Sequence, residues 1–102
     1  MSTKLLILYA QPDDEDAFLT RYNDVHMPLA RTIPGLERAV VNRVDANLIS
    51  GASPYFIITE LHFADKAAFD LAMASPENRA AGKDAMSFAK GKFTLLAVTP
   101  ES

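Results

Sequence analysis

Tyr22 and His26 lie four residues apart in the stretch FLTRYNDVHMPLA, which runs from Phe18 to Ala30. On a helix, this spacing makes the two side chains neighbours. A histidine, with an ordinary pKa of about 6.5, exchanges protons near neutral pH, and a tyrosine hydroxyl can donate to a developing oxyanion. We therefore interpret His26 as a general acid/base and Tyr22 as a hydroxyl donor.

Pro28 follows at a point where the helix would otherwise continue. It clashes with the backbone carbonyl of Asp24 and cannot donate a hydrogen bond to it, so we expect a kink there. The kink would turn His26 toward a pocket between the helix and a sheet. The alternative is a structural histidine that satisfies the carbonyl freed by the break.

Asp84 is the carboxylate that we expect to orient His26. It precedes Phe88 by one turn of a predicted helix, and it reaches the imidazole if both helices cover the same face of the sheet. A carboxylate bound to one ring nitrogen fixes the tautomer of the ring. The alternative is an ordinary solvated aspartate.

The second histidine, His62, follows Glu60 by two residues on a predicted strand, so both side chains point to one face. Such a pair could be catalytic or bind a metal, but we interpret it as a polar pair that satisfies itself on the sheet face at the dimer barrel. With two histidines, no cysteine and no HxxH or HxH spacing, we expect no metal site. A haem would have only a single histidine to support it, and phosphate-loop and GxSxG motifs are absent, so we expect no cofactor.

Four aromatic side chains are expected to form the walls of a pocket for a flat apolar ligand: Tyr9, Tyr55, Phe93 and Phe18. Aromatic residues on strands are otherwise ordinary core material. Because side chains alternate along a strand, Tyr55 is expected on the same face as Ile57.

Hydrophobic patterns predict the elements that must position these residues. Strands are expected over residues 3–11, 54–63 and 92–99, and within residues 36–50, where the strand runs into a polar loop. Helices are expected within residues 12–35, from Asp65 to about Ala74, and from Pro76 to near Gly91, with Asp65 and Ser75 as N-caps. At 100° per residue, the first helix has an apolar stripe with His26 beside it. The stripe comprises Phe18, Tyr22, Val25, Leu29 and Ile33.

This β-α-β-β-α-β order predicts an α+β fold of the ferredoxin-like type, in which residues 1–102 form a single domain. The expected architecture is a four-stranded antiparallel sheet with helices on one face. The uncovered face would expose large apolar side chains. Monomers rarely expose such a patch, so we expect a homodimer in which two sheets pack together.

Composition narrows the choice of partners. The 102 residues, 49% hydrophobic and 23% charged, are typical of one globular domain. The net charge of −3 argues against nucleic-acid binding. No apolar run reaches the length of a membrane span, and the N-terminal KLLILYA is too short for a signal peptide. We expect a cytoplasmic protein that binds neither nucleic acid nor membrane.

Three segments resemble the EthD family, which takes its name from ethyl tert-butyl ether degradation: FLTRYNDVHMPL, PYFIITELHFADKAAF and DAMSF. The matching elements are Tyr22-x-x-x-His26-x-Pro28-Leu29, Glu60-x-x-Phe63, and Asp84 before Phe88. The resemblance implies a dimeric α+β barrel, in which two ferredoxin-like units pack their sheets together.

The resemblance also implies a role in a catabolic or secondary-metabolism pathway. The family's named member is required beside a cytochrome P450 system, and barrels of this shape include cofactor-free monooxygenases, lactone isomerases and polyketide cyclases or decarboxylases. Three functions stay open at this point. They are a cofactor-free enzyme that acts on an apolar oxygenated small molecule, a non-catalytic binding or accessory protein with the same pocket, and a purely structural dimer.

Overall fold

The computed structural model describes residues 2–101 and has the expected β-α-β-β-α-β order. The strands are β1 (Thr3–Ala10), β2 (Arg38–Arg43), β3 (Tyr55–Phe63) and β4 (Phe93–Val98). The helices are α1 (Glu15–Arg21), α2 (Met27–Ala30), α3 (Lys66–Met73) and α4 (Pro76–Ala89), with a π-helical turn, η1 (Tyr22–His26), between α1 and α2.

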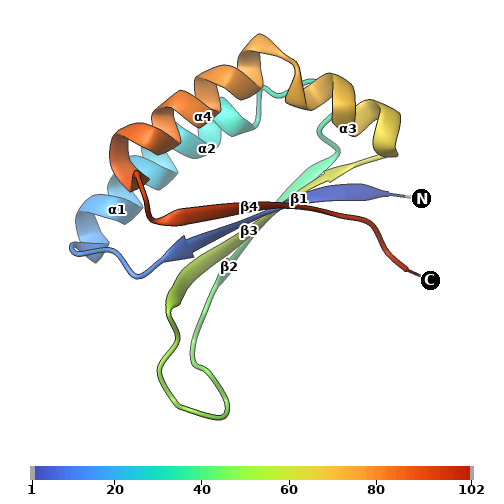
Figure 1. The fold of residues 1–102 in the computed structure, drawn as a ribbon. Coiled ribbons are helices and arrows are strands. Elements are labelled where there is room, and N and C mark those ends of the chain that lie inside the picture. The colour runs from blue at the N-terminus through green and yellow to red at the C-terminus, as the bar shows by residue number, and fades with distance from the viewer. Residues whose placement is uncertain (1, 102) are drawn as a thin grey trace.

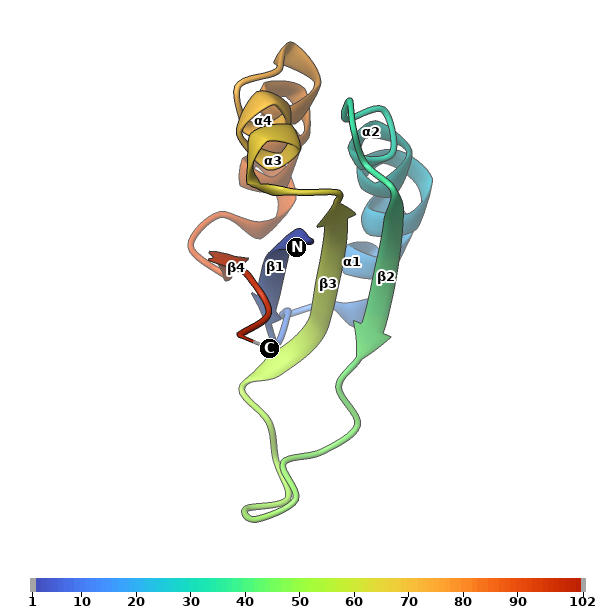
Figure 2. The same cartoon turned by 90° about the vertical axis from the view of Figure 1, so that its right-hand side faces the viewer.

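The four strands form one sheet in the order β2-β3-β1-β4, and every neighbouring pair is antiparallel. All the helices lie on one side of this sheet, as Figures 1 and 2 show from two directions. The predicted ferredoxin-like α+β architecture is therefore confirmed. Within residues 2–101, the sheet separates a face covered by helices from a face that no helix covers.

Local side-chain chemistry fixes where three of the helices begin. Asp14, Asp65 and Ser75 each accept a hydrogen bond from the backbone N–H three residues later, which satisfies a donor that the helix itself cannot pair. Pro76 then occupies the first turn of α4, where a missing N–H costs nothing. The predicted caps of the two later helices are confirmed.

The break at Pro28 takes the form of a π-turn rather than a simple kink. The N–H of Met27 donates a hydrogen bond to the carbonyl of Tyr22, five residues earlier. The helical turn just before the proline therefore contains one residue more than an α-helical turn. The extra residue rotates the rest of the helix. Val25, which the regular stripe placed inside, is 37% exposed, whereas His26 is 7% exposed. The prediction that His26 lies beside the stripe was wrong: it lies within it.

A β-bulge changes which face of the sheet the side chains at the start of β3 point to. Tyr9 pairs with Ile57 but Ala10 pairs with Tyr55, so Phe56 is the extra residue on β3. Phe56 is consequently buried with Ile57 under the helices, while Tyr55 is 38% exposed and shares the other face with Ala10. The prediction that Tyr55 and Ile57 share a face was therefore wrong.

The uncovered face of the sheet carries apolar side chains from all four strands. By their register, this face includes Leu6, Leu8, Val40, Ile58, Leu96 and Val98. β2 ends at Arg43, and the polar loop that was expected to follow it projects away from the helices (Figures 1 and 2). At the loop tip, Leu48 and Ile49 are 98% and 99% exposed.

Candidate functional site

His26 and Asp84 meet under the helices, on the covered side of the sheet. The Nδ1 atom of His26 lies 3.1 Å from Oδ2 of Asp84. On the other carboxylate oxygen, Asp84 accepts hydrogen bonds from the guanidinium of Arg21, one of them from Nε at 3.1 Å. Because the carboxylate accepts from Nδ1–H, the neutral imidazole keeps a lone pair on Nε2. His26 and Asp84 are both only 7% exposed.

Tyr9 faces the free nitrogen of His26. Its hydroxyl lies 3.4 Å from Nε2, a long hydrogen bond in which the hydroxyl donates. Tyr9 is 1% exposed, and its burial, with the nearby Tyr22 and Asp84, raises the pKa of its hydroxyl far above the ordinary value. Tyr9 thus remains a hydrogen-bond donor at any physiological pH.

Burial makes His26 a neutral base at neutral pH. Desolvation is the largest cause and lowers the pKa of the imidazole below its ordinary 6.5. The hydrogen bond and the charge of Asp84 act in the opposite direction, and the positive charge of Arg21 lowers the pKa further. The arrangement leaves Nε2 unprotonated while Asp84 can still stabilise an imidazolium that forms transiently.

Tyr22 is placed beside His26 but with its hydroxyl turned away. Its ring lies 5.7 Å from the imidazole at an angle of 21°, and its hydroxyl is hydrogen-bonded to Thr59 on β3. Burial raises the pKa of Tyr22 to about 12, against the opposing effects of the Thr59 hydrogen bond and the charge of Arg31. The hydroxyl nearest to the free nitrogen of His26 therefore belongs to Tyr9, which the sequence indicated only as a pocket wall.

His26 and Tyr9 line a small apolar cavity between α4 and the sheet. Its volume is about 60 Å³. The other lining residues are mostly apolar and come from β1, β3, β4, α2 and α4 and from the turn after α2; they include Ile7, Ala30, Ala81, Ala85, Phe93 and Leu95. Of the predicted wall residues, this cavity contains Tyr9 and Phe93.

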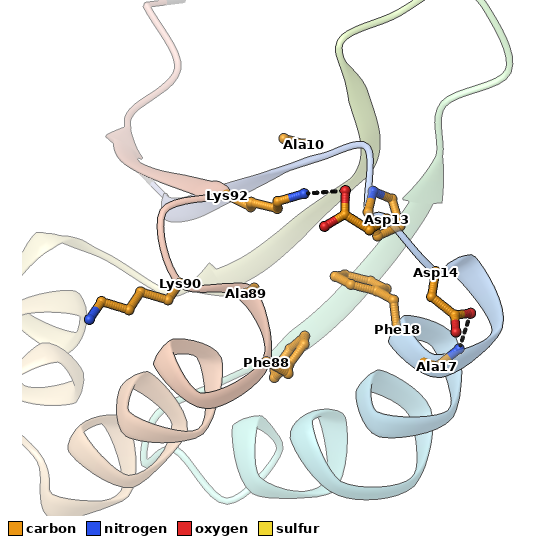
Figure 3. A pocket seen from close by; sticks show the side chains of 10 residues that line it. Ala10, Asp13, Asp14, Ala17, Phe18, Phe88, Ala89, Lys90 and Lys92 are labelled. Carbon is orange, nitrogen blue, oxygen red and sulfur yellow. Dashed lines mark hydrogen bonds and ion pairs between the residues drawn. The ribbon is translucent and has the colours of Figure 1, made fainter.

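A larger cavity of about 280 Å³ lies near the end of β1, between α1 and α4. Figure 3 shows the aromatic side chains of Phe18 and Phe88 among the residues that line it, and the two rings lie edge to face with centroids 5.3 Å apart. At its rim, Nζ of Lys92 lies 3.1 Å from a carboxylate oxygen of Asp13. Phe18, another predicted wall residue, is found here, whereas Tyr55 lines neither cavity.

The second histidine lies on the uncovered face of the sheet, together with Glu60. Nε2 of His62 is 2.9 Å from Oε1 of Glu60, and Asn42 donates to Oε2 at 3.0 Å. The Asn42 hydrogen bond is the main cause that lowers the pKa of Glu60, with smaller contributions from His62 and from Lys4, 3.8 Å away, while desolvation opposes the shift. This geometry is that of a polar pair that satisfies itself.

Residues 2–101 offer neither a metal cluster nor a membrane-spanning helix. Within this range no three His, Asp or Glu side chains cluster closely enough to hold a metal ion. Over the same range no helix has the length and apolar character needed to cross a membrane.

The fold and the site together define a ferredoxin-like α+β protein with a buried histidine–aspartate pair next to an apolar cavity. The family model of the EthD domain matches residues 10–92, which is most of the chain. The protein belongs to the EthD family, as the segments around His26, Glu60 and Asp84 predicted.

Two relatives are similar over nearly their whole length. One is an uncharacterized 11.0 kDa protein from the thcB–thcC intergenic region of Rhodococcus erythropolis, 33% identical over 97% of this chain and 95% of its own. The other is the crystal structure of an EthD family protein from Bacillus halodurans, 38% identical, with a TM-score of 0.92 over 98% of this chain and 99% of that one.

More distant solved structures share the fold alone. A dimeric ferredoxin-like protein of unknown function from Jannaschia is 15% identical, with a TM-score of 0.70 over 98% of this chain and all of its own. The hydroxynitrile lyase of Passiflora edulis is 12% identical, with a TM-score of 0.76 over 99% of this chain and 95% of that one. The fold therefore occurs both in dimers and in at least one enzyme, without carrying either property to this chain.

Proposed function

We propose that this protein is a small cofactor-free enzyme that transfers protons on an apolar, oxygenated small molecule. The observation that carries the proposal is the line of hydrogen bonds from Asp84 through His26 to Tyr9, which ends at an apolar cavity. A neutral base, a fixed tautomer and a hydroxyl donor at one cavity are the elements that proton abstraction beside a carbonyl needs.

His26 is the base in this mechanism. Its Nε2 removes a proton from a carbon beside the substrate carbonyl, and the electron pair of the broken C–H bond moves onto the carbonyl oxygen. Tyr9 donates a hydrogen bond to that oxygen and keeps its own proton, because its pKa is strongly raised. The imidazolium, stabilised by Asp84, then returns the proton to another atom of the enolate.

The remaining residues act through His26. Arg21 holds the second oxygen of Asp84, and so keeps the carboxylate aligned on Nδ1. Tyr22 lies against the imidazole, and with its hydroxyl bonded to Thr59 it fixes the plane of the ring. We propose Tyr22 as a positioning residue rather than as the oxyanion donor.

The test is exchange of an acidic C–H proton for deuterium, followed by NMR on 2-tetralone, a flat apolar ketone. In His26→Gln the protein-catalysed exchange rate should fall by about 10²-fold or more, the usual contribution of a positioned base. The matched control is His62→Gln, which alters the other histidine of the chain and should leave the rate unchanged. Equal rates in the wild type and His26→Gln would contradict the role of His26.

A non-catalytic binding protein is the second candidate. The favouring observation is that the larger cavity is walled by Phe18 and Phe88 and does not include His26. This candidate predicts saturable binding of an apolar ligand without any product or any deuterium exchange. Detection of exchange that depends on His26 would exclude it.

We propose that the protein is a homodimer joined through the uncovered sheet faces. Support comes from the apolar side chains on that face, such as Leu8 and Leu96, and from the dimeric structures that share the fold. A Leu8→Arg change places like charges opposite each other and should yield monomers in sedimentation velocity. Lys83→Glu, a charge change on an exposed helix position, is the control and should leave the dimer intact.

A further inference from the structure

Two cavities follow one another along the sheet-facing side of α4. Ala81 and Ala85 line the cavity that contains His26, and the next turn of the helix, at Phe88 and Ala89, lines the larger one. The cavity at His26, about 60 Å³, has room for a few waters or one small polar group. The larger cavity, about 280 Å³, approaches the size of an ordinary small-molecule site. A substrate that reacts at His26 must therefore keep most of its body elsewhere.

Phe88 stands between the larger cavity and His26. Its ring forms part of the larger cavity on one side and lies 5.2 Å from the imidazole on the other. It also stacks on Tyr9, with centroids 6.3 Å apart and an angle of 25°, so the two rings bridge the gap between α4 and β1. Removing or rotating this one side chain would expose His26 to the larger cavity.

We propose that the cavity lined by Phe18 and Phe88 is the binding site for the body of the substrate, whose oxygenated end reaches His26 when Phe88 rotates aside. The reaction of the bound ligand at His26 rests on the proposed function, whereas the binding of the ligand in this cavity does not. Phe88 is partly exposed and belongs to the last turn of α4, which ends just before Gly91. Its ring contacts four aromatic side chains, those of Tyr9, Phe18, Tyr22 and His26, so its rotation requires that contacts with the ligand replace these.

The lining of the cavity indicates the class of ligand. Two aromatic rings, from Phe18 and Phe88, suit a flat aromatic body. Three of the four charged residues that line the cavity are already engaged, since Lys92 pairs with Asp13 and Asp14 caps α1. Lys90 points away from the two rings (Figure 3). We therefore infer a neutral ligand with a flat aromatic body and one hydroxyl or carbonyl group at its end.

The first experiment uses 2-naphthol as the probe and measures both its binding by calorimetry and its protection of histidines from diethyl pyrocarbonate. The two histidines are resolved by mass spectrometry, so His62 is an internal control. We expect 2-naphthol to slow the modification of His26 at least tenfold at saturation and that of His62 not at all. Binding without protection of His26, or no binding, would overturn the proposal.

A pair of variants on α1 locates the probe. Ala17 is exposed and lines the larger cavity, so Ala17→Trp should fill it and weaken 2-naphthol binding at least tenfold. Thr20→Trp places the same side chain on an exposed position of the same helix outside the cavity and should leave binding unchanged. Equal effects of the two variants would place 2-naphthol elsewhere and overturn the site.

The role of Phe88 has its own test. Phe88→Ala should increase the rate at which diethyl pyrocarbonate modifies His26 at least tenfold, with the rate at His62 unchanged. Phe88→Leu, which retains more of the packing, should give a smaller increase in the same direction and serves if the alanine variant does not fold. Unchanged His26 modification in both variants would show that Phe88 does not separate the cavities.

Charged analogues test the ligand class. 2-Naphthoate and 2-naphthylmethylammonium have the same ring system as 2-naphthol with a negative or a positive end, and each should bind at least tenfold more weakly. Stronger binding of either would overturn the inferred neutrality. These binding results are independent of catalysis: if 2-naphthol protects His26 but deuterium exchange persists in His26→Gln, the proposed function fails while the binding site stands.

Discussion

Two histidine–carboxylate pairs lie on opposite faces of one sheet, and their surroundings differ far more than their chemistry. His26 and Asp84 lie beneath helices, with side chains 9% and 5% exposed. His62 and Glu60 lie on the uncovered face, with side chains 14% and 25% exposed. The distances within the pairs are similar, 3.1 Å and 2.9 Å.

A histidine–carboxylate contact alone therefore does not make a candidate site. Under the helices, the Arg21 guanidinium occupies the second carboxylate oxygen, a tyrosine hydroxyl faces the free ring nitrogen, and an apolar cavity adjoins both. On the uncovered face, the neighbours are Asn42 and Lys4, and neither of the two cavities described above includes His62. The surroundings of the pair, rather than the pair itself, distinguish the two faces.

The largest difference between the two pairs is expected when the carboxylate of each is removed in turn. Asp84→Ala leaves Nδ1 of the buried His26 without its partner, whereas the half-exposed guanidinium of Arg21 can turn to water, and we expect it to lower the free energy of unfolding by about 2–3 kcal/mol. Glu60→Ala breaks a pair that solvent reaches, and we expect a loss of about 1 kcal/mol or less. Urea denaturation of both variants measures the contrast. Equal losses would mean that burial does not distinguish the two pairs.

A smaller effect separates the two tyrosines next to His26. Tyr22→Phe leaves the hydroxyl of Thr59, itself 2% exposed, without its partner, so we expect about 1–2 kcal/mol less stability and a nearly unchanged rate of deuterium exchange. Tyr9→Phe removes the donor at Nε2 and should lower the exchange rate at least tenfold with a smaller loss of stability. Urea midpoints and exchange rates of the pair decide the assignment. The opposite pattern would make Tyr22 the oxyanion donor.

Much of the architecture could be predicted because its signals are local. Neighbouring residues alone determine the helix caps at Asp65 and Ser75 and the alternation of side chains along β3 from residue 57 to residue 63. The order of the elements then determines the topology of the sheet. That both helical segments cover one face follows from the right-handed crossovers, and this made the contact of Asp84 with His26 foreseeable.

Three details at the site could not be predicted because non-local packing decides them. The apolar stripe assumed regular helix geometry, whereas the π-turn inserts one residue and exchanges Val25 for His26 in the interior. The alternation of β3 fails at the bulge, which buries Phe56 in place of the predicted Tyr55. The meeting of Tyr9 with His26 joins residues 17 positions apart through the packing of η1 on β1, which no spacing in the sequence reports.

The smallest effect expected is the pH dependence of stability that His26 contributes. The pKa of His26 is lowered in the folded protein, so below about pH 6.5 the unfolded chain binds the proton more readily and stability rises with pH. The stability present above pH 6.5 is therefore lost as the pH falls from 6.5 to the lower pKa of the folded state. Urea midpoints between pH 8 and pH 5 should fall in the wild type and in His62→Gln, and fall less in His26→Gln. If His62→Gln, rather than His26→Gln, reduces the fall of the urea midpoint, then His26 is not the histidine that causes the pH dependence.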